Sequence, residues 1–168
     1  FVLTPLPGSE DHQTLFRKGV AMDPDLNIYD VEHVCTDHPK MSKQEWESIY
    51  QEAWSLYYSP EHMKTLLRRA VATGVPLARL VKVLVSFATT VPLENVHPLQ
   101  SGLLRLKHPS ERRPDLPRES ALVFWPRFIG ETIAKHLKLG GTIARLAVTA
   151  FMISRDKNAK TYMDQALT

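Results

Sequence analysis

The residues best placed for chemistry stand near the start of the chain. Gly8 and Ser9 supply a turn and a helix N-cap, and Glu10, Asp11 and His12 follow in the first helical turn. Free N–H groups at a helix start attract an anion, but the two acidic side chains already fill that role. The segment is therefore no free phosphate cradle, and a plain helix cap is one of two interpretations of it.

A short apolar run positions these residues. Phe1 to Thr4 is stopped by Pro5 and Pro7, which predicts a strand, then a loop, then the helix. In a parallel barrel the loops that follow the strands face the reaction centre, so the loop from Thr4 to Glu10 would line it. One strand cannot make a barrel. Because the chain opens on Phe rather than Met, we expect the rest of the barrel to lie upstream.

Asp23, Asp25 and Asn27 stand at every second position, as the first oxygen ligands of an EF-hand calcium loop do. The later positions do not match that loop. Ile28 stands at the sixth position, where Gly is required, and Val34 stands at the twelfth, where a bidentate Glu is required. A turn in which the side chains bond their own backbone is expected instead.

His33, Cys35 and His38 offer three metal-capable groups within six residues. A structural zinc site needs a fourth ligand, and the neighbouring sequence supplies none that is obvious. We therefore predict a packed thiol between two linker histidines rather than a metal site.

Two basic regions are candidates for binding an anion or a partner. The concentrated patch consists of Arg105, Lys107, Arg112 and Arg113. Acidic residues nearby reduce the net positive charge of this patch, so the alternative is an ordinary solvated loop. The second region is the predicted helix over 126–153, where cations accompany many apolar residues. That helix could contact a membrane surface or pack on another part of the protein.

The composition is that of an ordinary globular chain. The 168 residues are 43% hydrophobic and 23% charged, with a formal net charge of +3, which permits contact with anions without requiring nucleic acid. One cysteine and no signal sequence favour the cytoplasm. No transmembrane span is expected, because cations interrupt the apolar stretches before the roughly 20 residues that a bilayer requires. Nucleophile elbows, Walker loops and dinucleotide glycine patterns are absent from the sequence.

The predicted fold class is mainly α, with one N-terminal strand followed by about six helices. Ser42 and Glu45 form a capping box before an aromatic-rich helix. We expect the apolar stripe of that helix in the core: Trp46, Ile49, Tyr50, Ala53, Trp54 and Tyr57.

Four further helices are expected, most of them from caps and prolines. Ser59 with Pro60 begins a helix that Gly74 ends, and Pro76 opens the next. A short helix is expected near 98–107. A long helix is expected from Pro126, and the glycine pair 140–141 could bend or interrupt it.

Motifs spread along the chain point to one family. The opening motif is Phe-x-Leu-Thr-Pro-Leu-Pro-Gly-Ser-Glu-Asp-His at 1–12, and the likeness continues through Met22-Asp-Pro-Asp-Leu-Asn27, Tyr29-Asp30, His38-Pro39, Met41-Ser42, Glu45-Trp46, Ala53-Trp54, Tyr57-Tyr58, Glu61-His62, Arg68-Arg69, His97-Pro98-Leu99-Gln100, Arg112-Arg113-Pro114 and 162–168. The chain resembles the C-terminal region of radical SAM enzymes with an upstream B12-binding (cobalamin-binding) domain. This resemblance implies that residues 1–20 are the last strand-loop-helix of a truncated radical SAM barrel and that 21–168 form a C-terminal helical domain.

The resemblance implies a parent that cleaves S-adenosylmethionine at a 4Fe–4S cluster and generates a radical on an unknown substrate. Cobalamin could bind upstream. Such enzymes hold the cluster with three cysteines spaced Cys-x3-Cys-x2-Cys, whereas this chain has Cys35 alone. We therefore expect the fragment to hold no cofactor and to be non-catalytic by itself.

The resemblance also implies positions for the loop residues. Thr4 and Pro5 would shape the wall of the cleft for S-adenosylmethionine and substrate, and Glu10 or His12 would bond polar groups of a ligand. The expected partners are the missing B12-binding and radical SAM domains, and no nucleic acid. The alternative is a free-standing helical module that docks a protein or an anionic surface through 105–118 or the long helix.

Overall fold

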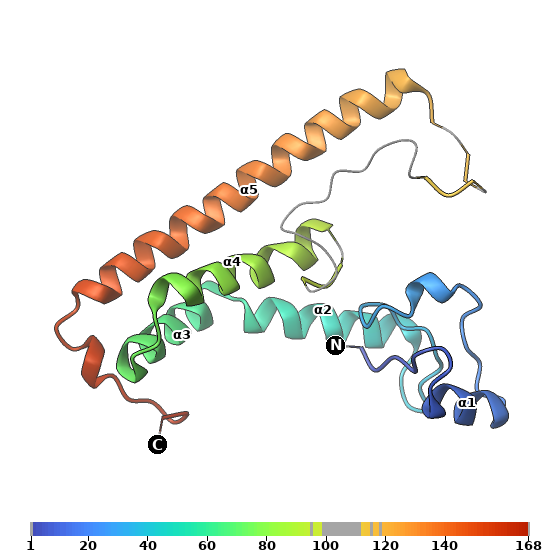
Figure 1. The fold of residues 1–168 in the computed structure, drawn as a ribbon, viewed down its shortest axis with the longest axis horizontal. Coiled ribbons are helices and arrows are strands. Elements are labelled where there is room, and N and C mark those ends of the chain that lie inside the picture. The colour runs from blue at the N-terminus through green and yellow to red at the C-terminus, as the bar shows by residue number, and fades with distance from the viewer. Residues whose placement is uncertain (1, 95, 99–111, 115, 118, 168) are drawn as a thin grey trace.

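Helices make up most of the described chain (Figure 1). The computed structural model describes residues 2–94, 96–98, 112–114, 116–117 and 119–167. In order, the elements are α1 Glu10–Arg17, the 3₁₀ helix η1 Leu26–Ile28, α2 Lys43–Tyr57, α3 Pro60–Thr73, α4 Leu77–Glu94, α5 Ala121–Arg155 and the 3₁₀ helix η3 Ala159–Thr161. The prediction of a mainly α fold is confirmed. The short helix expected near 98–107 lies, from residue 99 onward, outside the described residues.

The caps of α2 and α3 lie where the sequence predicts them. Ser42 Oγ accepts from the Glu45 N–H at 3.2 Å, while Glu45 Oε2 accepts from the Ser42 N–H at 2.8 Å, which completes the capping box. Ser59 Oγ accepts from the His62 N–H at the start of α3. Gly74 ends α3 with a φ of +75°, the left-handed conformation that glycine adopts without steric cost.

The long helix α5 starts earlier than predicted. It begins at Ala121 and continues without interruption through Gly140 and Gly141 to Arg155, so the predicted start at Pro126 is wrong. Pro126 is tolerated near the helix start because it removes only one hydrogen bond of the ladder, the one to the Leu122 carbonyl. At about 1.5 Å per residue, α5 is about 50 Å long.

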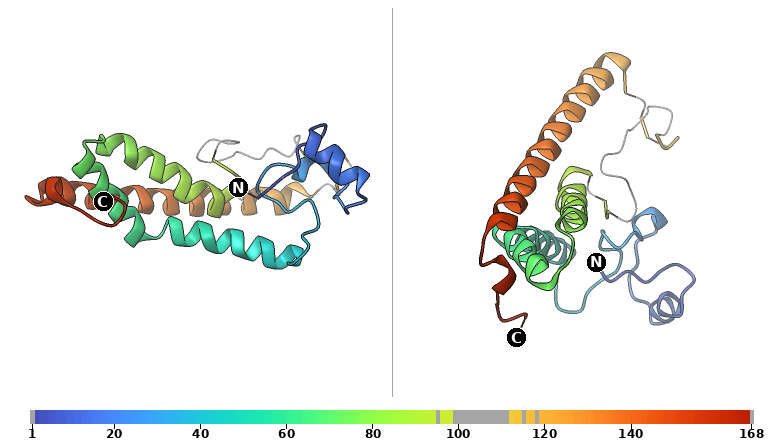
Figure 2. Two further views of the ribbon diagram at one scale, coloured as in Figure 1. Left: turned by 90° about the horizontal axis from the view of Figure 1, so that it is seen from below. Right: turned by 60° about the vertical axis from the view of Figure 1, so that its left-hand side comes forward.

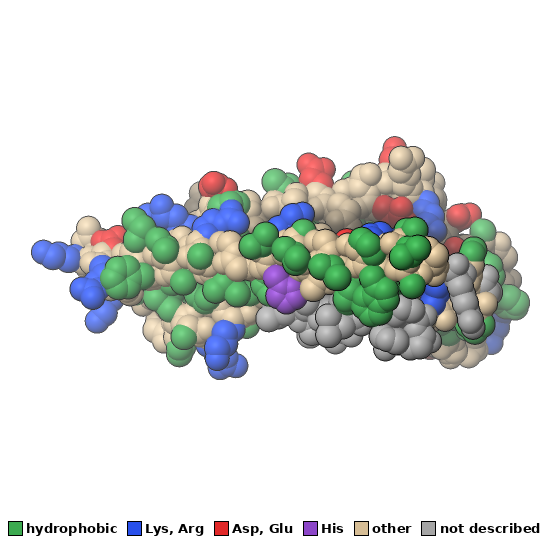
Figure 3. Space-filling model, turned by 90° about the horizontal axis from the view of Figure 1, so that it is seen from above, with side chains coloured by type: hydrophobic (Ala, Val, Ile, Leu, Met, Phe, Trp, Pro, Cys, Tyr) green, Lys and Arg blue, Asp and Glu red, His purple; other side chains and the backbone are tan. Residues whose placement is uncertain are grey.

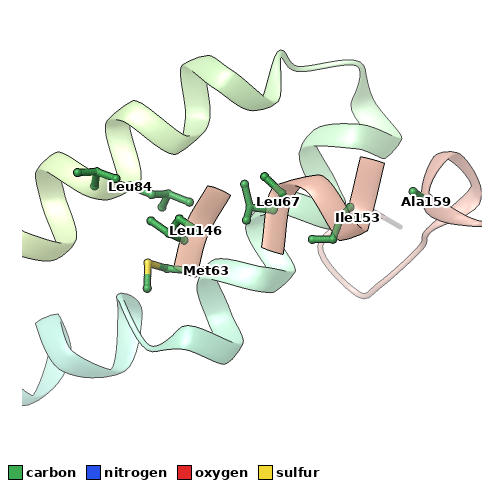
Figure 4. Packing of buried hydrophobic residues seen from close by; sticks show 8 residues of the cluster. Met63, Leu67, Leu84, Leu146, Ile153 and Ala159 are labelled. Carbon is green, nitrogen blue, oxygen red and sulfur yellow. The ribbon is translucent and has the colours of Figure 1, made fainter. Parts of the chain in front are cut away.

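The main core lies where α3, α4, the C-terminal part of α5 and η3 meet. Leu67 of α3 is fully buried, and Leu84 of α4 and Leu146 of α5 pack beside it (Figure 4). Figures 1 and 2 show α5 lying along α3 and α4 at this end and diverging from them toward its own N-terminus. The buried residues of α5 are therefore confined to its last third: Leu146, Ala150 and Ile153.

A second, smaller core lies beside α2. Its buried members are Val2, Val34 and Tyr50, with Trp46 and Trp54 packed against them. The predicted core stripe of α2 is correct for those three aromatic residues but wrong for Ile49 and Tyr57, which are each 52% exposed, and for Ala53, which is also exposed. The reason is that only the face of α2 that carries Tyr50 and Trp54 is packed, against the small core and, through Trp54, against Phe87 of α4. Tyr58, at the C-terminal end of α2, packs against the main core.

The expected strand at the N-terminus is not formed within the described residues 2–4. These residues make one backbone hydrogen bond there, from the Val2 N–H to the Val31 carbonyl at 2.7 Å. A strand needs a ladder of such bonds to a neighbour. The one β-bridge among the described residues joins Met22 and Thr36 instead.

Candidate functional site

The N-terminal segment is extended, with one face buried and the other exposed. Val2 is 2% exposed and Pro5 is buried, whereas Leu3 is 79% and Leu6 is 55% exposed. Within the described chain, the backbone N–H groups of Leu3, Thr4 and Leu6 have no hydrogen-bond partner. The segment 3–6 therefore presents an unpaired backbone edge beside two exposed apolar side chains, and we call it the open edge.

A strained turn holds the inner side of this segment. Val31 has a φ of +65°, a conformation that β-branched residues rarely adopt, and its carbonyl is the acceptor for Val2. The Asp30 carboxylate fixes the turn by accepting from the N–H groups of Glu32 and His33 at 3.0 and 3.1 Å. The backbone hydrogen bond that anchors Val2 is thus made by a residue in a strained conformation.

Thr4 lies against the only cysteine. Its hydroxyl donates to the Val2 carbonyl at 3.1 Å and also hydrogen-bonds with the Cys35 thiol. Cys35 is 3% exposed, and burial raises the pKa of its thiol. A protonated, packed thiol is neither a nucleophile nor a metal ligand.

The loop residues Glu10 and His12 both lie in the first turn of α1. Ser9 Oγ accepts from the His12 N–H at 3.2 Å, which confirms the N-cap. Glu10 is exposed, whereas the half-buried His12 ring lies edge-on to the Tyr29 ring with 6.1 Å between centroids. No residue of α1 is buried by the described chain, and Phe16 is 71% exposed.

The histidines that flank Cys35 have separate partners. His33 Nδ1 lies 2.8 Å from Asp30 Oδ2, and the His38 ring packs edge-on against Trp46 with 5.1 Å between centroids. Among the residues that the structure describes, no group of three His, Cys, Asp or Glu side chains could hold a metal ion.

The predicted aspartate turn is confirmed. Asp23 Oδ1 accepts from the Asp25 N–H at 2.9 Å, and Asp25 Oδ1 accepts from the Asn27 N–H at 3.0 Å. Hydrogen bonds from Asn27, aided by Arg113, lower the pKa of Asp25 to about 2.

Only part of the predicted basic patch can be placed. Arg105 and Lys107 lie outside the described residues. Arg113 Nη1 lies 3.0 Å from Asp25 Oδ2, so this cation is engaged within the chain. Arg112 is exposed and has no partner in the described ranges.

Sequence reasoning missed a buried acid beside the open edge. Glu32 is 7% exposed, and its Oε2 accepts from the Tyr50 hydroxyl at 2.8 Å, while Oε1 has no partner among the described residues. Burial raises the pKa of Glu32. A loop glutamate gives no sequence signal of burial, since its partner stands 18 residues away on α2.

An aromatic cluster continues from Tyr50 toward α4. Trp54 lies between Tyr50 and Tyr58, and its Nε1 donates to the Phe87 carbonyl at 3.2 Å. Burial raises the pKa of Tyr58 to about 12 and lowers the pKa of His97, whose ring meets Trp54 edge-on. The cluster joins the small core to the main one.

A second buried acid lies at the end of α4. The Glu94 side chain is fully buried, and Lys135 Nζ of α5 approaches its Oε1 to 3.0 Å. No hydrogen bond of good geometry reaches either Glu94 oxygen from the described part of the chain. This ion pair ties the middle of α5 to α4.

Two of the hollows on the described surface lie away from Thr4, Pro5, Glu10 and His12, which line neither of them. One lies at the start of α2. The other, between α3 and α5, is lined by Pro60, Glu61, Met63, Lys64, Arg145, Leu146 and Thr149.

Protein-family models, curated proteins and solved structures were each compared with the chain, and none of them matches it.

In the described part of the chain, α5 is the one helix long and apolar enough to cross a membrane, judged by length and composition. Its most apolar window of 18 residues has a mean hydropathy of 1.3, and 11% of that window is buried. The expectation that the chain has no transmembrane span stays a prediction.

Proposed function

We propose that this chain is the C-terminal part of a radical SAM enzyme of the type with an upstream B12-binding domain. The motifs at 1–12 and 22–69 support the proposal. The structural observation that carries it is the open edge at residues 3–6, with its unpaired N–H groups and the exposed Leu3 and Leu6. A barrel strand whose neighbours belong to another part of the protein would present these features.

In this proposal, residues 1–20 complete the barrel and 21–168 cover its mouth. α1 would pack on the outside of the barrel, as the helices of such barrels do, and this packing would bury Phe16. The loop from Thr4 to Glu10 would then lie at the catalytic end. Thr4 and Pro5 would form part of the wall, with Glu10 and His12 at the rim.

The cofactors would be held upstream. A 4Fe–4S cluster that binds S-adenosylmethionine needs three thiolates, and this chain offers one buried cysteine. When bound, the reduced cluster would supply one electron, which would cleave S-adenosylmethionine to methionine and a 5′-deoxyadenosyl radical. The residues of this chain would exclude water and confine the radical beside the substrate. Such a cluster suits the reducing cytoplasm.

The test begins with the full reading frame that contains these residues. The protein is purified anaerobically, reconstituted with iron and sulfide, and given S-adenosylmethionine with a reductant. We expect a three-cysteine motif upstream, cluster absorption and formation of 5′-deoxyadenosine. A frame without that motif, or a reconstituted protein that leaves S-adenosylmethionine intact, would overturn the proposal.

A matched pair of variants tests the role of the open edge. Leu3→Asp places a charge at the proposed barrel contact and should abolish 5′-deoxyadenosine formation. Leu56→Asp changes a leucine of α2 that is 63% exposed and should leave it unchanged. Equal activity of the two variants would count against a barrel contact at Leu3.

The second candidate function is a free-standing helical module that binds a protein or an anionic surface. The outward apolar face of α5 favours it, because that face has no partner within the described chain. A start codon immediately before Phe1 would support this alternative over the enzyme.

A further inference from the structure

We propose that the outward face of α5 docks on the surface of an anionic lipid bilayer, with the helix lying in the membrane plane. This inference names the anionic surface of the second candidate function as a lipid bilayer, and it does not depend on the enzymatic role. Figure 3, a view onto α5, shows apolar side chains along the helix, with Lys and Arg along one edge and at one end.

Only a narrow stripe of α5 faces the protein. Its buried and half-buried residues recur every three or four positions: Phe124, Phe128, Thr132, Lys135, Leu139, Thr142, Leu146, Thr149, Ala150 and Ile153. At about 100° per residue these positions fall on one side of the helix. The remaining sides of a 35-residue helix are therefore left to the surroundings.

The opposite side is apolar and carries no charge between Ala121 and Ser154. Its large members are Leu122 at 87% exposure, Ile129 at 53%, Ile133 at 55%, Leu137 at 72%, Val148 at 59% and Phe151 at 60%. A helix that faces water places polar residues there instead. An exposed apolar surface of this length marks an interaction site.

The charges beside this face select the partner. Lys138 and Arg145 stand along one edge, exposed and without an acidic partner in the described residues. Residues 121–160 contain seven of the 21 Lys and Arg residues but only two of the 18 acidic ones, Glu131 and Asp156. Cations flanking an apolar face complement lipid phosphates, since their stems reach past apolar groups to the headgroups.

The arrangement favours docking in the plane over crossing the bilayer. Lys135, in the middle of α5, forms an ion pair with the buried Glu94, and the last third of α5 is packed in the main core. A helix held along one side cannot present all its sides to lipid. Trp125, 45% exposed near the helix start, suits the headgroup region.

Vesicle co-sedimentation of the full-length protein tests this proposal. We expect binding to vesicles that contain phosphatidylglycerol, at least about tenfold weaker binding to phosphatidylcholine alone, and a loss of binding at high salt. Leu137→Asp should abolish binding. Lys138→Gln with Arg145→Gln should weaken binding only to the anionic vesicles, by about tenfold or more.

Matched controls lie on α4, away from this face. Val83→Asp changes a valine that is 46% exposed, and Lys82→Gln removes an exposed cation; both should bind as the parent does. Circular dichroism verifies that every variant folds. The proposal fails if Leu137→Asp folds and still binds, or if anionic and neutral vesicles bind equally. It also fails if alkaline washing leaves the protein in the bilayer, which would show a spanning helix, or if Leu137→Asp dissolves a dimer that binds no vesicles.

Discussion

The Tyr50 hydroxyl donates a 2.8 Å hydrogen bond to Glu32 Oε2 and so fastens the N-terminal loops to α2. Both residues are buried, and Glu32 has no second partner among the described residues for its other oxygen. This bond lies beside Val2, the anchor of the open edge. The stability of the small core therefore depends on the protonation of one acid.

Tyr50→Phe should destabilise the protein by about 1–3 kcal/mol, since it leaves a buried carboxyl group without its donor. Chemical denaturation at neutral pH measures the change. Tyr57→Phe, at a side chain that is 52% exposed, is the control and should have little effect. Equal stability of Tyr50→Phe and the parent would show that the hydrogen bond contributes nothing net.

Glu32→Gln should stabilise the protein at neutral pH, because the amide oxygen can still accept from Tyr50 without a buried charge. Burial raises the pKa of Glu32 in the folded state, so the folded state holds its proton to higher pH than the unfolded state does. The contribution of Glu32 to stability is thus complete below the unfolded pKa of about 4.3 and is lost as pH rises through the folded pKa. Unfolding free energies measured from acidic to neutral pH should show the advantage of Glu32→Gln growing with pH. A constant difference would contradict this account.

Leu67→Ala should lower the free energy of unfolding by about 2–5 kcal/mol. Leu67 is fully buried between α3, α4 and α5, so the truncation leaves a cavity that the neighbouring side chains cannot fill. Leu56→Ala, on the exposed side of α2, should change the unfolding free energy little. Urea denaturation of both variants makes the comparison. A cost at Leu67 no larger than at Leu56 would mean that the three helices do not share one core.

Lys135→Met should lower the free energy of unfolding by about 3–5 kcal/mol, since it leaves the buried charge of Glu94 without its partner. Adding Glu94→Gln in the same chain should restore most of that loss. The double-mutant cycle is measured by thermal unfolding. Additive losses in the double variant would argue against a direct pair between α4 and α5.

Local features of the fold could be predicted from the sequence. The capping box at Ser42 and Glu45 and the glycine cap at Gly74 depend on residues a few positions apart, so a short stretch of sequence specifies them. The start of α5 could not be placed, because the proline signal at Pro126 outweighed the helix-forming residues before it.

The candidate site could be predicted only in part. The N-cap at Ser9 and the turn at Asp23 are local and were predicted correctly. The pairs Glu32–Tyr50 and Lys135–Glu94 join distant segments, and no periodicity indicates them. The engagement of Arg113 by Asp25 likewise depends on how the chain returns to its N-terminal part.

Hydrogen exchange of the full-length protein at Leu3 and Thr4 tests the central claim most directly. If an upstream barrel strand pairs with the open edge, these two amides should be protected as strongly as the helical amides of α3. If they exchange at the rate of unprotected amides while α3 stays protected, the edge has no neighbour, and this chain does not complete a barrel.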